Sequence, residues 1–229
     1  MLKKVFRENW LTRAPARNGL VPTAVLVALL VFGKLFEHPA TPDRVYAHHE
    51  YWRAWTTLFV HAGPEHLLAN LFLFVPFAYV LTGYFSPFFF PLGGFLVGGL
   101  VNLVVLKTLP PGTSLVGVSG VVYWMGAAWI TLGLLVDRRE KVSIRIVKAL
   151  GVSMLLFLPE RYQPEVSYLT HALGYLAGIL TALLYYSIAR GSFRRAEKYD
   201  YRYDFDLHWN PKENGYSEEL PEDLSIRES

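Results

Sequence analysis

The 229-residue chain contains no cysteine, which excludes disulfides, thiolate metal sites and a cysteine nucleophile. Charged residues are also scarce, at 18% of the chain, whereas hydrophobic residues make up 52% and aromatic residues 15%. With a mean hydropathy of +0.26, this composition is typical of a membrane protein rather than of a soluble domain. The formal net charge is only +3, and we expect no nucleic-acid partner.

The apolar residues form runs that are long enough to cross a membrane. A spanning helix needs about 20 mostly apolar residues. The segments that reach or approach this length are roughly 19–36, 66–84, 88–107, 115–136, 144–159 and 167–189. The first run has no small-residue cleavage site after it, so we interpret it as a retained span and not as a signal peptide. The sequence predicts an all-α membrane protein with a basic N-terminal tail (1–18), a six-span core (19–189) and a polar C-terminal tail (190–229).

Basic residues predict the orientation, because Lys and Arg accumulate on the cytoplasmic side of a membrane. They gather in the N-terminal tail, in the loop after the fourth span and at the start of the C-terminal tail. Six spans put these three regions on one side, whereas five or seven spans would separate them. We therefore predict a multi-pass protein of the cell membrane with both termini in the cytoplasm. The external loop 37–65 is rich in aromatic residues, and we expect it to lie in the membrane interface.

No acidic residue lies well inside a predicted span, but a few other polar residues do. Polar groups inside a membrane are costly, so each one indicates a function by default. His66 and Asn70 are four residues apart and share one helix face, although an interhelical hydrogen bond is the plainer interpretation of this pair. Ser119 lies next to a glycine at the start of the fourth span, and His171 lies at the start of the sixth. Taken singly, Ser119 could be a packing residue and His171 a structural one.

The depth of these residues in the membrane favours a common role. Spans two, four and six all begin on the external side, and we expect Ser119 and His171 about four residues inside their helices, roughly 6 Å below the boundary. A serine and a histidine at one depth can form a nucleophile–base pair, and His66 and Asn70 could then donate to a developing oxyanion. Because no carboxylate is available, we predict a dyad whose imidazole is held by the ring of Tyr123. Such a site needs a cavity that is open to external water.

Together these residues resemble the motifs of the rhomboid protease family, in the family's order along the chain. Trp52 and Arg53 are similar to its WR motif, and His66 and Asn70 to its HxxxN motif. Three further matches are Gly117, Ser119 and Gly120 for GxSG, Tyr123 for the tyrosine that stacks on the histidine, and His171, Gly174 and Gly178 for HxxGxxxG. Thr170 departs from the alanine that is common before the catalytic histidine. The resemblance covers about residues 19–189.

The resemblance implies a six-helix rhomboid fold and a serine endopeptidase. It would cut transmembrane protein substrates in the lipid bilayer near the external face, without cofactor or metal. Ser119 would be the nucleophile, His171 the base, and His66 and Asn70 the oxyanion donors. Three other hypotheses stay open. The chain could be a catalytically silent rhomboid relative that binds membrane clients. It could be a transporter or channel, which would more often show repeated halves and intramembrane charge. It could also hold a metal between His61, His66 and His171.

Overall fold

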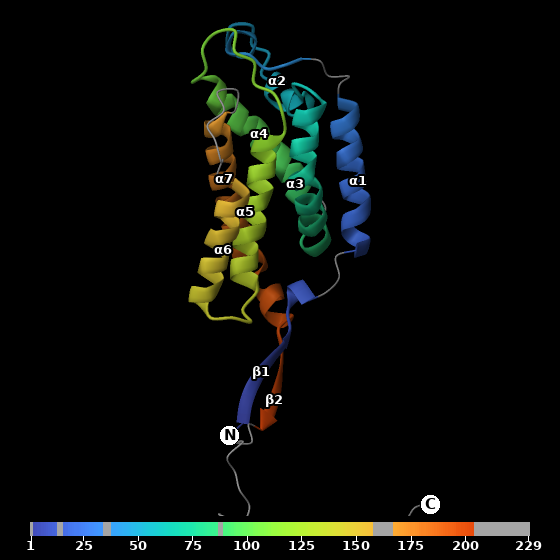
Figure 1. Ribbon diagram of the computed structural model, residues 1–229, viewed down its shortest axis with the longest axis vertical. Coiled ribbons are helices and arrows are strands. Elements are labelled where there is room, and N and C mark those ends of the chain that lie inside the picture. The colour runs from blue at the N-terminus through green and yellow to red at the C-terminus, as the bar shows by residue number, and fades with distance from the viewer. Residues whose placement is uncertain (1, 13–15, 34–37, 87–88, 158–166, 204–229) are drawn as a thin grey trace, which may run out of the picture. The chain divides into compact units, whose positions relative to one another are not determined.

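The computed structural model describes residues 2–12, 16–33, 38–86, 89–157 and 167–203 (Figure 1). The chain divides into two compact units. The larger unit, Glu8–Glu197, holds all the long helices, and the smaller unit contains the two ends of the chain.

Each of the predicted spanning segments overlaps one long helix, and the predicted span ends 34–36 and 158–159 lie outside the described residues. These helices are α1 (Ala16–Phe32), α3 (Pro64–Tyr84), α4 (Phe89–Leu106), α5 (Ser119–Val136), α6 (Val142–Phe157) and α7 (Tyr168–Arg195). By length and composition, α3, α5 and α7 qualify to cross a membrane, and two shorter apolar helices, Asn18–Phe32 and Leu92–Leu106, lie within α1 and α4. The helix α6 has only 16 residues. The helical membrane fold is therefore confirmed in outline, while the count of six spans stays a prediction.

The helix α5 is the central element of the bundle. It packs against α3, α4, α6 and α7, and 56% of its apolar window is buried, against 33% for α3 and 17% for α7. Its Trp124 is the largest fully buried side chain among the described residues. Apolar side chains such as Leu96, Val147 and Leu155 are exposed on the outer helices. An exposed apolar surface of this kind suits contact with lipid.

Glycines allow α5 and α7 to approach each other closely. A Cβ atom at Gly174 would lie 2.3 Å from the carbonyl oxygen of Gly120, and one at Gly178 would lie 2.3 Å from that of Trp124. From the first contact to the second, both helices advance by four residues in the same direction. The two helices are therefore parallel, as the predicted topology requires of spans four and six.

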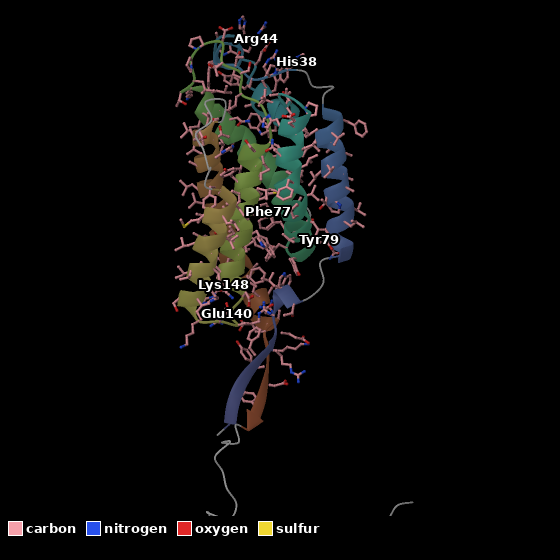
Figure 2. All side chains as sticks on the ribbon, viewed as in Figure 1. His38, Arg44, Phe77, Tyr79, Glu140 and Lys148 are labelled. Atoms are coloured by element: carbon pink, nitrogen blue, oxygen red, sulfur yellow. The ribbon has the colours of Figure 1, made fainter. Side chains whose placement is uncertain are left out.

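One end of the bundle gathers three segments that are distant in the sequence. Asn9 donates a hydrogen bond to Asp137 at 3.1 Å, and Trp10 packs edge-on against Phe193 at 5.3 Å. The segment before α1, the loop after α5 and the last turns of α7 thus lie together. Figure 2 shows the ion pair of Glu140 and Lys148 at this end, with His38 and Arg44 at the opposite end.

The smaller unit is a two-stranded sheet that the all-α prediction did not include. Strand β1 (Leu2–Glu8) pairs with β2 (Lys198–Tyr203). Arg7 forms a 2.5 Å ion pair with Asp200, and Phe6 packs edge-on against Tyr199. Cross-strand side-chain pairs such as these stabilise a two-stranded sheet. Each of the two predicted tails therefore contributes one strand. Residues 204–229 of the predicted C-terminal tail lie outside the described residues.

The described part of the loop that is predicted to be external, 37–65, is built from short helical turns. They are η3 (Asp43–Ala47), α2 (Arg53–Thr56) and η4 (Thr57–Phe59), and a further turn, η1 (Trp10–Thr12), precedes α1. Tyr51 and Trp52 are about half exposed, at 46% and 48%. Exposed aromatic rings suit the interfacial location predicted for this loop.

Candidate active site

Ser119 is the first residue of α5. The prediction that Ser119 lies about four residues inside the helix is wrong, because the preceding residues are held in a non-helical conformation. Leu115 N donates to Ala40 O at 2.8 Å, and Gly117 N donates to Thr57 O at 3.1 Å. Gly117 has a φ of +101°, which a residue with a side chain rarely adopts. The chain therefore turns sharply into α5 and presents Ser119, half-buried, at the helix N-terminus.

Thr57, which the sequence alone does not single out, fixes the segment before Ser119. This threonine is fully buried. Its Oγ1 donates to Leu115 O and accepts a hydrogen bond from Ala40 N at 3.2 Å. The carbonyl oxygen of Thr57 also accepts the hydrogen bond from Gly117 N. Thr57 thus joins the first loop to the turn that leads into Ser119. No motif marks it, because its role depends on partners that are far away in the sequence.

His171 is the fourth residue of α7 and stacks on Tyr123 of α5. The two ring centroids are 4.0 Å apart and the ring planes differ by 12°. The Tyr123 hydroxyl donates to Phe157 O at 3.2 Å, so the ring is fixed at its far end. The stacking that the sequence predicted is therefore present. In the described structure no hydrogen bond joins Ser119 to His171; catalytic hydrogen bonds are often long without substrate and tighten when it binds.

Close packing next to Ser119 and His171 holds α5 and α7 at a fixed distance. A Cβ atom at Gly120 would meet the Thr170 methyl group at 2.7 Å. Thr170 is buried and forms a 2.7 Å hydrogen bond with Ser167 between their hydroxyls. The residue that departs from the family pattern thus packs directly against the GxSG turn. Ser119 directly precedes Gly120, and His171 directly follows Thr170. Both residues therefore lie beside this close contact between α5 and α7.

His66 and Asn70 lie against the glycine turn. A Cβ atom at Gly117 would be 3.0 Å from His66 Nε2 and 3.8 Å from Asn70 Nδ2. His66 Nδ1 accepts a hydrogen bond from Ala62 N at 3.4 Å, so Nε2 carries the ring hydrogen and directs it toward the turn. Asn70 Nδ2 donates one hydrogen to His66 O at 3.0 Å and keeps the second. Two side-chain donors thus meet close to the N-terminus of α5.

A cavity of about 650 Å³ joins these residues. Ser119, His171, Tyr123, His66 and Asn70 all line it. The remaining lining residues come mainly from α3, from the segment before α5 and from the ends of α6 and α7: Ala62, Glu65, Ala69, Leu73, Asn102, Leu109, Thr113, Ser114, Leu115, Val116, Gly117, Val122, Leu156, Ser167 and Thr170. The structure therefore brings the predicted nucleophile, base and oxyanion donors to one cavity.

Trp52 and Arg53, also predicted as supporting residues, are not among the described residues that line the cavity. The Arg53 guanidinium lies 4.8 Å from the centre of the Trp52 ring and forms an ion pair with Glu50. This pair stabilises the first loop. His61 packs edge-on against His66 at 5.3 Å, and burial together with the neighbouring His66 lowers the pKa of His61.

A family model for the Rhomboid domain matches residues 48–188, more than half of the chain. The chain belongs to the rhomboid family. The match runs from just before Trp52 to beyond Gly178, so it includes every predicted site residue of this rhomboid, and it excludes α1 and both strands. A search of curated proteins finds no match to the chain.

Proposed function

We propose that this rhomboid is an intramembrane serine endopeptidase. The observation that carries the proposal is the shared cavity, in which Ser119 at the start of α5 accompanies a His171 ring stacked on Tyr123. A histidine fixed by an aromatic ring can act as a base without an orienting carboxylate. The nucleophile, a base and a third group that orients the base are the parts that nucleophilic catalysis requires.

The reaction follows from these groups. Ser119 Oγ attacks the scissile carbonyl carbon while His171 takes the hydroxyl proton. The C–N bond then breaks, His171 returns the proton to the leaving amine, and the acyl group stays on Ser119 as an ester. Water gives a proton to His171 and attacks the ester, which releases the acid and restores the Ser119 hydroxyl.

The oxyanion of each tetrahedral intermediate would form beside Gly117. His66 Nε2–H and the free amide hydrogen of Asn70 point to this region. The first backbone N–H groups of α5 also belong here, since the N-terminal turn of a helix leaves its donors unpaired. Donors positioned before the reaction stabilise developing charge at no cost of reorganisation, and removing one typically lowers kcat by about 10²–10³-fold.

We infer six spans with both termini in the cytoplasm. The pairing of β1 with β2 supports this, because paired strands must lie on the same side of a membrane. The number of crossings between them is then even, as it is for six. The basic residues of the α5–α6 loop and the end of α7, at the bundle end that also holds Asn9, favour the cytoplasm for that side. Ser119 and His171 then lie at the external ends of α5 and α7, where substrates would be transmembrane proteins.

The test is cleavage of a single-span reporter protein in liposomes by the wild type, Ser119→Ala and His171→Ala. We expect the wild type to cut and both variants to lose at least about 10³-fold in rate. Retention of cleavage by Ser119→Ala would overturn the proposal. If the wild type binds such proteins and cuts none of a broad panel, the protein is instead a silent client-binding relative.

A further inference from the structure

Glu65 is the only acidic side chain among the described residues that line the cavity, and no Lys or Arg lines it. It is exposed and lies one residue before His66, in the first turn of α3. Farther along α3, Ala69 and Leu73 also line the cavity. The cavity therefore has a small, apolar wall on this helix with a single negative charge at the external end.

Glu65 also differs from other acidic residues in having no ion-pair partner in the described part of the chain. Carboxylates elsewhere that have a basic partner within 4.0 Å are Asp43, Glu50, Asp137, Glu140, Glu197 and Asp200. An unpaired charge beside apolar walls acts on incoming ligands more strongly than the same charge in open water, because low-dielectric walls focus its field.

We propose that Glu65 selects substrates that carry a Lys or Arg close to the scissile bond. This inference rests on the proposed function and names the substrate class of the same site. The scissile carbonyl must lie between Ser119 Oγ and the donors of His66 and Asn70. Glu65 is the neighbour of His66, and adjacent Cα atoms are about 3.8 Å apart, so its carboxylate borders the path of the bound chain. An extended substrate chain advances about 3.3 Å per residue. The substrate Lys or Arg that pairs with Glu65 would therefore lie within about three residues of the cleaved bond.

Glu65 has a second effect that the test must separate. An acidic residue in the first turn of a helix stabilises it through the helix dipole. A change at Glu65 could thus alter the overall activity through α3, whatever the substrate. The ratio of rates on two substrates by the same variant removes this effect, since a damaged helix lowers both rates together.

The experiment uses single-span peptides with Lys, Gln or Glu at each of three positions on either side of the scissile bond. For the wild type we expect Lys to be cut about fivefold faster than Gln at one or two adjacent positions, and Glu to be cut more slowly, the size expected of an exposed ion pair. Glu65→Gln should remove the preference and Glu65→Lys should reverse it. Glu140→Lys, the same charge reversal at the opposite end of the bundle, should keep the wild-type ratios. The preference should also shrink at 1 M salt.

An unchanged Lys-to-Glu ratio in Glu65→Lys would overturn the inference while leaving the protease intact. Binding of the same peptides to the Ser119→Ala protein gives a second readout that needs no cleavage. There, Glu65→Lys in the Ser119→Ala background should reverse the order of affinities. If the wild type cuts no peptide, the proposed function fails, and the binding order alone decides whether Glu65 selects a cation.

Discussion

The contact between α5 and α7 gives the sharpest prediction about how the fold supports the site. In Gly174→Ala, the new Cβ atom would lie 2.3 Å from Gly120 O, and ordinary van der Waals contact begins at 3.4 Å. The helices must therefore separate by about 1.1 Å, the difference of these two distances. Overpacking of this kind costs about 1–3 kcal/mol of unfolding free energy. A shift of about 1 Å between catalytic groups can lower the rate about 10²-fold.

The matched control is Gly133→Ala, on α5 itself, where an added Cβ meets nothing within 4 Å. Alanine is a better helix former than glycine, so this variant should be neutral or more stable by up to about 1 kcal/mol. Thermal unfolding in detergent and initial cleavage rates in liposomes check both effects. If Gly174→Ala unfolds and cuts like Gly133→Ala, glycine packing does not set the spacing of Ser119 and His171.

Three further changes test separate parts of the site and of the bundle that holds it. Gly117→Ala should lose about 10²-fold or more in cleavage rate, because it strains a positive φ and meets the His66 ring at 2.8 Å; a rate near that of the wild type would contradict this. Tyr123→Phe should keep most activity, since the ring that stacks on His171 remains, whereas Tyr123→Leu should lose about tenfold or more in kcat; equal rates for the two variants would show that stacking is unimportant. Arg145→Leu should lower the unfolding free energy by about 1–3 kcal/mol, measured by thermal unfolding, because the guanidinium donates to two backbone carbonyls at the end of α5 at 2.6 and 3.1 Å. It should leave KM unchanged, and a changed KM with normal stability would contradict the assignment.

The sequence predicted the helices well because runs of apolar residues carry their own signal. A membrane allows few backbone structures, and a helix that satisfies its own hydrogen bonds is one of them. The sheet of β1 and β2 was missed, since its strands are almost 200 residues apart and a short strand has no stable form without its partner. The start of α5 was also misplaced. The apolar pattern continues from Leu115, but pairing with Ala40 and Thr57 holds that segment out of the helix.

The chain's composition, its apolar runs and the spacing of its polar residues by themselves determined a helical membrane protein and pointed to Ser119, His171, His66 and Asn70. These signals are local, because the helix repeat converts spacing along the chain into a shared face. Only the tertiary structure decided that these residues line one cavity, that Thr57 holds the turn before Ser119, and that Glu65 is the lone charged side chain among the described residues of the cavity wall. Contacts between distant segments set these features, and no local pattern in the sequence encodes them.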